Sequence, residues 1–274
     1  MICDIPILGF IIVGAFLCEL IDSSLGMMYG TILSPVLIIA GLNPLIVVPS
    51  VLFSQAVGGF VASIRHQQLN NVNFSIKKDI MNRLYELGYL ETFKRSTTRD
   101  LKVAFVVTSF GILAAIISAL IAINIPTVVL KMYIGILVFS IGMVLLLRSK
   151  FNFTWKKILG IGILSAFNKG ISGGGFGPVV TSGQLISGRD SKESIGVTTL
   201  SEAPICIAGF LTYLLKNGLS TWELIFPLTI GASIGAVIGP YITKKFKSEK
   251  KIRLSLGILV TFLGIWTLIK TCLV

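Results

Sequence analysis

The sequence predicts an all-α polytopic membrane protein made of two inverted repeats, and three observations support this fold class. The 274-residue chain is 54% hydrophobic and 13% charged, and its mean hydropathy is +0.89. Its apolar residues gather in runs long enough to cross a hydrocarbon core of about 30 Å. Related glycine and charged residues also occur twice at a constant spacing. Each repeat is therefore expected to hold a broken or re-entrant helical hairpin and three transmembrane helices.

Two interrupted apolar segments and six continuous ones make up the predicted elements. The first repeat, 1–147, is expected to contain the hairpin 7–40, the spans 44–64, 103–123 and 126–147, and a polar loop at 66–102. The second repeat, 148–274, is expected to contain the hairpin 157–187 and the spans 194–215, 223–243 and 254–273. Each continuous run has the length of a transmembrane helix, whereas each interrupted one is broken near its middle.

The distribution of positive charge predicts the orientation in the membrane. The net charge is +12, and Lys and Arg cluster at 65–102, 148–157 and 244–253. Such loops are typically cytosolic, so we expect all three in the cytosol and both termini outside. This parity requires that 157–187 enters and leaves by one face, and its expected arms, 157–168 and 175–187, are too short for full crossings. Segment 7–40 is either re-entrant or two short crossings, which gives the same parity.

The polar loop at 66–102 is the one sizeable hydrophilic segment of the chain. Ile76, Ile80, Leu84 and Leu87 recur in it at helical spacing among charged residues. This pattern indicates an amphipathic helix that lies on the inner leaflet of the membrane.

Several functions are disfavoured by what the sequence lacks. The four cysteines are far apart and form no CxxC, so neither a metal cluster nor a disulfide framework is indicated. The chain has one histidine, His66, no HExxH and no P-loop motif, so we expect no enzyme, no ATP-driven pump and no cofactor. Because the basic residues flank membrane spans, no nucleic-acid partner is expected either. The oligomeric state is left open.

An offset of 147 residues aligns the two halves without a gap across each hairpin and the span that follows it. The coinciding small residues are Gly26 and Gly173, Gly30 and Gly177, Gly41 and Gly188, Ser54 and Ser201, and Ala56 and Ala203. Asp22 falls on Lys169, and Gln55 falls on Glu202. The loop charges place the first hairpin on the outside and the second on the cytosolic side, as in an inverted duplication. Chance similarity between two glycine-rich apolar segments is the alternative explanation.

Both hairpins carry a glycine-rich motif and are followed by a span that bears a serine. The motifs are 25–30 (Leu-Gly-Met-Met-Tyr-Gly) and 170–178 (Gly-Ile-Ser-Gly-Gly-Gly-Phe-Gly-Pro). In these features, and over nearly all of the chain apart from 66–100, the sequence resembles the TauE/SafE family of membrane permeases, also described as sulfite exporters. Met27 and Met28 stand where that family usually has glycines, so the second hairpin is the better candidate for a binding site. The resemblance implies transport of a small sulfur-containing anion such as sulfite or an organosulfonate.

The second hairpin is predicted to hold the anion. Lys169 lies in an apolar segment just before three consecutive glycines, and an ionisable residue at such a depth is a candidate functional residue. Glycine N–H groups near the start of a half-helix can bind an anion. The expected substrate-binding residues are Lys169, Ser172, Gly173, Gly174, Gly175, Thr181, Ser182, Thr198, Thr199, Ser201, Gly26, Ser54 and Gln55. Close helix packing would also explain the glycines, and the hydroxyls could instead bond to helix carbonyls.

Three acidic residues accompany Lys169 in the apolar segments. Glu202 either pairs with Lys169 or carries a coupling proton. Glu19 and Asp22 share one helix face, and they either balance Lys169, bind a cation or lie in solvent near the hairpin tip.

These residues predict a secondary transporter that exports a small anion from a midplane site between the hairpins. Its expected partners are the anion, the lipid bilayer and, where transport is coupled, a proton or other ion. An anion channel, or a permease for a small carboxylate or another anion, is the alternative.

Overall fold

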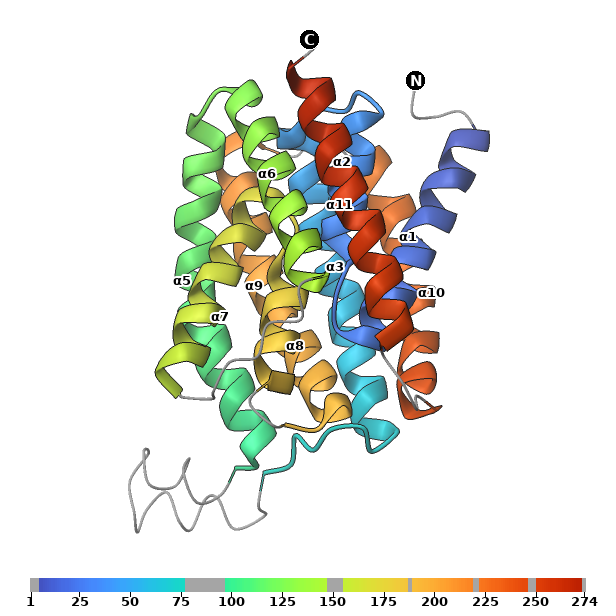
Figure 1. Cartoon of the computed structure of the whole chain (residues 1–274), viewed down its shortest axis with the longest axis vertical. Coiled ribbons are helices and arrows are strands. Elements are labelled where there is room, and N and C mark those ends of the chain that lie inside the picture. The colour runs from blue at the N-terminus through green and yellow to red at the C-terminus, as the bar shows by residue number, and fades with distance from the viewer. Residues whose placement is uncertain are drawn as a thin grey trace.

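The computed structural model describes residues 5–76, 97–146, 155–186, 189–218, 222–245 and 250–272, which are almost entirely helical. The helices of this part are α1 (Ile5–Leu25), α2 (Tyr29–Ile39), α3 (Pro44–Gln68), α5 (Arg99–Asn124), α6 (Thr127–Leu146), α7 (Trp155–Ser172), α8 (Phe176–Ile186), α9 (Ser191–Asn217), α10 (Trp222–Lys245) and α11 (Lys250–Cys272). They form one bundle (Figure 1). α1, α3, α5, α6, α9 and α10 are long and apolar enough to cross a membrane. The predicted all-α polytopic class is confirmed.

Polar caps and glycine set where several of the spans begin and end. Asn43 accepts a hydrogen bond from the N–H of Leu45 at the start of α3, and Asp190 accepts from Lys192 at the start of α9. α9 ends at Asn217, just before Gly218, whose φ of 71° lies in the left-handed region. α9 extends beyond the apolar run 194–215 at both ends, whereas α3 begins at the first residue of the run 44–64 and continues past its end to Gln68.

The second hairpin, α7 and α8, enters and leaves the bundle at the same end. α7 runs alongside α5 in the same direction, because Gly162 packs near Val107 and Gly170 near Ala115. α5 begins where Asp100 pairs with Arg189, the residue that follows α8 in the described part. Segment 157–187 is therefore a re-entrant hairpin and does not cross the bundle.

The first hairpin, α1 and α2, enters from the opposite end. α1 runs alongside α10 in the same direction, because Gly231 packs against Ile12 and Gly239 against Ser23. α10 finishes near the start of α9, where Lys192 donates to the carbonyl of Lys244 over 3.2 Å. Lys270, near the end of α11, donates to the carbonyl of Ile39 at the end of α2. Figure 1 likewise shows the start of α1 and the end of α11 at one end of the bundle.

The two arms of each hairpin differ in length. α1 has 21 residues and α7 has 18, which gives about 31 Å and about 27 Å. α2 and α8 have 11 residues each, about 17 Å, so neither crosses a membrane. The end of α2 lies at the end of the bundle where α1 begins, so segment 7–40 enters and leaves by that end, with one arm long enough to cross a membrane. The predicted arm 157–168 is too short, because the helix continues past Lys169, which finds polar partners, and breaks only after Ser172.

The tips of the two hairpins pack directly against each other. A Cβ added to Gly30 would overlap the carbonyl oxygen of Gly173, and one added to Gly177 would lie 2.5 Å from the carbonyl oxygen of Gly26. Each tip therefore meets the first turn of the other hairpin's short arm. A side chain at either glycine would force the two backbones apart, so close packing accounts for these glycines.

Element boundaries of the two hairpins correspond at the offset of 147. α1 and α7 end at Leu25 and Ser172, α2 and α8 run over Tyr29–Ile39 and Phe176–Ile186, and α3 and α9 begin at Pro44 and Ser191. Positive φ angles also correspond: 70° at Gly26 and 74° at Gly173, then 114° at Met28 and 87° at Gly175. These matching helix boundaries and φ angles agree with a duplication of the hairpin. The inverted duplication itself stays a prediction.

Basic residues that the structure describes gather at the end where α5 and α9 begin. Arg65 donates to the hydroxyl of Tyr241, and Lys192 to the carbonyl of Lys244, so the ends of α3, α9 and α10 meet there. The predicted amphipathic helix of the 66–102 loop falls largely on 77–96, outside the described residues. Most of the other two basic loops, at 147–154 and 246–249, also lies outside them.

Candidate functional site

A buried network of charged and amide groups lies beside the contact between the hairpins. The Nζ of Lys169 donates to Oε1 of Glu202 over 2.8 Å and also to Oε1 of Gln55. Nε2 of Gln55 in turn donates to Oδ2 of Asp22 over 3.3 Å. The N–H of Tyr29, the first residue of α2, donates to the other carboxylate oxygen of Asp22 over 3.0 Å. We call Asp22, Gln55, Lys169 and Glu202 the central cluster.

The central cluster joins four helices and both hairpins. Asp22 and Lys169 occupy equivalent places, since the N–H of Gly26 donates to the carbonyl of Asp22 and the N–H of Gly173 to that of Lys169. Gln55 of α3 and Glu202 of α9 each bond to the hairpin arm that precedes them. The Lys169–Gln55 bond then links the two halves of the chain.

All four side chains of the central cluster are almost inaccessible, with at most 3% of the surface of any residue exposed. An ammonium group at this depth is tolerated only because a carboxylate and an amide oxygen surround it. Removing one partner would leave an uncompensated charge. The predicted pairing of Glu202 with Lys169 is therefore present, and Asp22 is buried rather than solvated.

Glu19 lies one helical turn before Asp22 and is fully buried. Asp22, Glu202 and Lys169 are close enough to interact with it electrostatically. Neither carboxyl oxygen of Glu19 has a hydrogen-bond partner among the described residues. Counted together, Glu19, Asp22 and Glu202 place three carboxyl groups beside the single ammonium of Lys169.

The glycine N–H groups at the second tip are all bonded to protein acceptors. Gly173 donates to the carbonyl of Lys169 over 2.8 Å, which prolongs the helix. Gly174 donates to the hydroxyl of Ser172 and Gly175 to the hydroxyl of Thr31, each over 3.1 Å. These donors can reach an anion only if the tip rearranges.

The predicted hydroxyl ligands fall into two groups. The Thr181 hydroxyl lies 2.7 Å from the carbonyl oxygen of Gly26, which joins α8 to the first tip, and 3.0 Å from the hydroxyl of Thr198. Thr198 itself donates to the carbonyl of Ser194 in its own helix over 2.8 Å. Thr199 and Ser201 donate to carbonyls of their own helix, over 2.9 Å and 2.7 Å. Ser54 lies 2.8 Å from the hydroxyl of Tyr29 and so borders the central cluster. The side chain of Ser182 is outside the described part.

Metal binding finds no support in this geometry. No three His, Cys, Asp or Glu residues come together as ligands in the described ranges.

Comparison with known proteins identifies the family of the chain. The model of the family described as sulfite exporter TauE/SafE matches residues 87–267, more than half of the chain. The chain belongs to the TauE/SafE family. A curated relative, the probable membrane transporter protein YtnM of Bacillus subtilis (strain 168), is 25% identical over 247 residues, which cover 85% of this chain and 73% of that protein. No solved structure matches.

The predicted family is thus confirmed, and this TauE/SafE protein is a multi-pass membrane transporter. The family match includes the second hairpin and the spans after it, and it begins beyond the first hairpin. Lys169 and Glu202 lie inside the matched region, whereas Asp22 and Gln55 lie outside it.

Some polar residues near the central cluster of this TauE/SafE transporter were not predicted from the sequence. The hydroxyl of Tyr133 on α6 donates to Oδ1 of Asn168, the neighbour of Lys169. Gln184 of α8 donates to the hydroxyl of Thr198 over 3.0 Å. A lone amide in an apolar arm was the available signal for Gln184, and adjacency to Lys169 was the signal for Asn168. Nothing in the sequence pointed to Tyr133.

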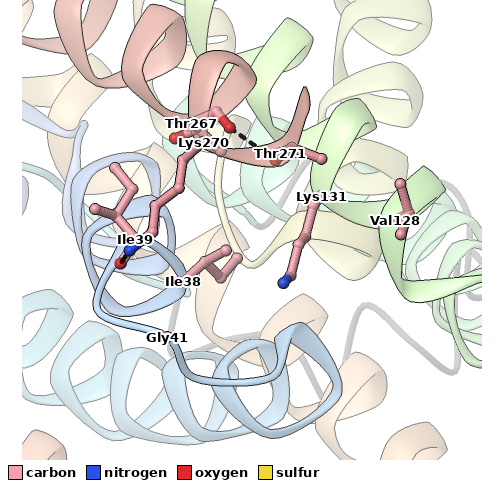
Figure 2. Close-up of a pocket in the computed structure, with 8 residues that line it drawn as sticks. All are labelled: Ile38, Ile39, Gly41, Val128, Lys131, Thr267, Lys270 and Thr271. Carbon is pink, nitrogen blue, oxygen red and sulfur yellow. Dashed lines mark hydrogen bonds between the residues drawn. The ribbon is translucent and has the colours of Figure 1, made fainter. Parts of the chain in front are cut away.

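A separate cavity of about 310 Å³ lies at the end of the bundle where α2 and α11 finish and α6 begins. It is lined by Ile38, Ile39, Gly41, Val128, Lys131, Thr267, Lys270 and Thr271. Figure 2 shows Lys270 reaching the carbonyl of Ile39, while Lys131 extends into the space between the helices. Among the described residues, the lining carries two ammonium groups and no carboxylate, so it favours anions.

Proposed function

We propose that this transporter exports a small sulfur-containing anion, such as sulfite or an organosulfonate, from a midplane site between the two hairpins. One observation carries the proposal: Lys169 is a buried ammonium group held by Glu202 and Gln55 beside the point where the hairpin tips meet. A small oxyanion at the membrane midplane needs a cation and directed donors to offset its desolvation.

Glu202 occupies the place that we assign to the substrate. Its carboxylate is itself an oxyanion 2.8 Å from Nζ of Lys169, and a sulfite or sulfonate group offers the same kind of acceptor. The arriving anion would displace Glu202 and accept from Lys169, which would keep its bond to Oε1 of Gln55. Ser172, Thr181 and the N–H groups of Gly173–175 would join them when the tip rearranges.

Two hairpins that enter from opposite ends support alternating access. In transporters built from inverted repeats, the substrate lies where discontinuous helices meet, and one repeat rocks against the other. Here the glycine contacts between Gly30 and Gly173, and between Gly26 and Gly177, form the surface on which such a movement would occur. The two halves, 1–147 and 148–274, are the proposed repeats.

The proposed direction follows from charge. With the basic loops in the cytosol and both termini outside, a cell interior at negative potential favours each exported negative charge by about 2.3 kcal/mol per 100 mV. The cavity of Lys131 and Lys270 lies at the proposed outer end, where two ammonium groups would receive the departing anion.

The direct test replaces Lys169 and measures exchange of radiolabelled sulfite across proteoliposomes. We expect Lys169→Ala to lower counterflow at least tenfold, whereas Lys216→Gln, at the exposed end of α9, leaves it unchanged. Because an unpaired Glu202 could unfold the single variant, Lys169→Gln combined with Glu202→Gln is measured beside it and should also be inactive. Wild-type counterflow in a folded Lys169 variant would rule out the proposal.

A thermal-shift screen of the purified protein with sulfite, thiosulfate, sulfonates and carboxylates identifies the preferred anion. Protection by carboxylates alone would favour a carboxylate permease. Single-channel currents in place of saturable exchange would favour an anion channel.

A further inference from the structure

Glu19 sits in a space that a glycine leaves open. It projects from α1 toward α3, where a Cβ added to Gly58 would lie 3.0 Å from its Cδ and 3.1 Å from each of its oxygens. On its other side, a Cβ added to Gly235 of α10 would lie 2.9 Å from the Cβ of Glu19. The carboxyl group is thus enclosed by backbone and has no donor among the described residues.

An ionised carboxylate is very costly in such a place. Desolvation costs several kcal/mol for an ion that no partner compensates, so the neutral acid is the form that fits. Lys169 lies near enough to act on Glu19 electrostatically, but its ammonium group is bonded to Glu202 and Gln55 and makes no hydrogen bond to Glu19. The charged or titratable groups around Glu19 are Cys18 and Asp22 on its own helix, Tyr29 of α2, Lys169 of α7, and Glu202 and Cys206 of α9.

The second half of the chain shows that this fold does not need a carboxyl group here. At the offset of 147, Glu19 and Gly58 correspond to Ala166 and Ile205. Ile205 and Ala166 pack together against Gly111 of α5, whose added Cβ would lie 2.5 Å from Cδ1 of Ile205 and 3.2 Å from the Cβ of Ala166. An isoleucine on the span therefore fills the volume that Glu19 fills in the first half. Packing alone gives no reason for a glutamate.

We propose that Glu19 is a proton-binding site and that one proton bound there moves with the anion in the same direction; this inference rests on the proposed function. Binding an anion at Lys169 adds a negative charge beside Asp22 and Glu202. A proton on Glu19 offsets that charge, so each ligand increases the affinity of the site for the other. The Glu19 carboxylate gains an O–H bond on the loading side and loses the proton to water on the releasing side. A doubly charged anion accompanied by one proton still carries negative charge outward, so the membrane potential still favours its export. A singly charged sulfonate accompanied by one proton moves without net charge, so the concentration gradients of the sulfonate and the proton set its direction.

The first test detects the proton itself, independently of any substrate. Infrared spectra of the purified protein at neutral pH should contain the C=O stretch of a protonated carboxyl group, shifted in D₂O. Glu19→Gln should remove this band, and Glu223→Gln, at the exposed start of α10, should retain it. A spectrum without the band, or a band that persists in Glu19→Gln, would overturn the inference.

The second test measures proton movement during transport. Proteoliposomes containing a fluorescent pH indicator receive a gradient of isethionate or of sulfite; isethionate is a sulfonate that does not titrate near neutral pH. In the wild type, protons should move with isethionate in the same direction. Glu19→Gln should keep anion exchange within about threefold of the wild type and lose the proton movement, and Glu223→Gln should keep both.

A second variant keeps this test decisive if Glu19→Gln does not fold. Glu19→Ala combined with Gly58→Ile copies the packing of Ala166 and Ile205, and it should behave as Glu19→Gln does. Wild-type anion flux without proton movement would refute coupling and leave the proposed function standing. Absence of flux for every anion in the screen would instead refute the proposed function, and the infrared band would still decide whether Glu19 holds a proton.

Discussion

The two hairpins share a backbone design and differ in the chemistry that it carries. In both, a long arm ends in a glycine with positive φ, an 11-residue arm follows, and a glycine in its first turn meets the opposite tip. The first hairpin and its following span contribute Asp22 and Gln55, while the second contribute Lys169 and Glu202 at the equivalent positions. The backbone contacts are therefore duplicated, and the charges are divided between the halves.

This division explains how a charged cluster persists inside an apolar bundle. If both halves carried the chemistry of the first, the cluster would contain carboxylates and amides without a cation. If both carried that of the second, two ammonium groups would face each other. One copy of each gives a chain of bonds from Asp22 through Gln55 and Lys169 to Glu202. The equivalent positions thus tolerate different residues as long as their charges complement each other.

The largest expected effect comes from making the second half resemble the first at its acidic position. Glu202→Gln removes the carboxylate beside Lys169 and leaves a buried ammonium group with amide partners only. We expect a loss of about 3–5 kcal/mol in stability. Lys169→Gln combined with Glu202→Gln should recover most of that loss, because the ammonium and the carboxylate of the ion pair are removed together and Asp22 keeps its bonds from Gln55 and the N–H of Tyr29. Thermal melting in detergent measures both, and equal melting temperatures for the single and double variants would contradict the charge argument.

The next effect concerns the contact that both halves share. Gly177→Ala places a Cβ 2.5 Å from the carbonyl oxygen of Gly26 and 2.7 Å from the Cα of Met27, which are backbone atoms of the other tip. We expect a loss of about 3 kcal/mol, since neither backbone can move without breaking its own turn.

Gly160→Ala is the matched control for Gly177→Ala, because nothing lies within 4 Å of a Cβ at that position of α7. It should be neutral or slightly stabilising in the same melting experiment. If the two alanine variants melted together, the hairpin tips would not be in close contact.

The sequence predicted the helices of the two halves better than the contacts between them. Hydropathy and length located each described span and both hairpins to within a few residues, because a membrane constrains those properties strongly. The expected arm 157–168 is shorter than α7. In the structure Lys169 is neutralised and the helix continues to Ser172.

The partners of the polar side chains could not be predicted, because they depend on how each helix is rotated and on what packs against it. Thr198 and Thr199 both donate to carbonyls of their own helix, but only Thr198 also meets a residue of another helix, Thr181, among the contacts of the described part. Tyr133 and Asn168 meet across two helices 35 residues apart in the chain. The pairing of Lys169 with Glu202 was foreseeable only as one of two options, since charge indicates a partner but not a distance.

The smallest expected effect on stability comes from the side chains that bond to helix carbonyls near the two hairpin tips, and these side chains differ between the halves. The helix leaves its last four carbonyls without intrahelical donors, and Ser23 and Gly170 belong to those groups. Nε2 of His66 donates to the carbonyl of Ser23 over 2.8 Å, and the hydroxyl of Tyr213 donates to that of Gly170 over 3.1 Å. His66 and Tyr213 are themselves equivalent at the offset of 147.

Tyr213→Phe removes one hydrogen bond and should cost about 1 kcal/mol. His66→Phe should cost about 2 kcal/mol, because Nδ1 of His66 also accepts from the side chain of Asn71 over 3.1 Å, so that two hydrogen bonds are lost and Asn71 keeps only its bond to the carbonyl of Pro240. Thermal melting of the two variants side by side gives the ranking. Equal losses would mean that the Asn71 bond contributes nothing to stability and that the hydrogen bonds at the two tips stabilise the protein equally. A larger loss for Tyr213→Phe would place the more important anchor beside Lys169.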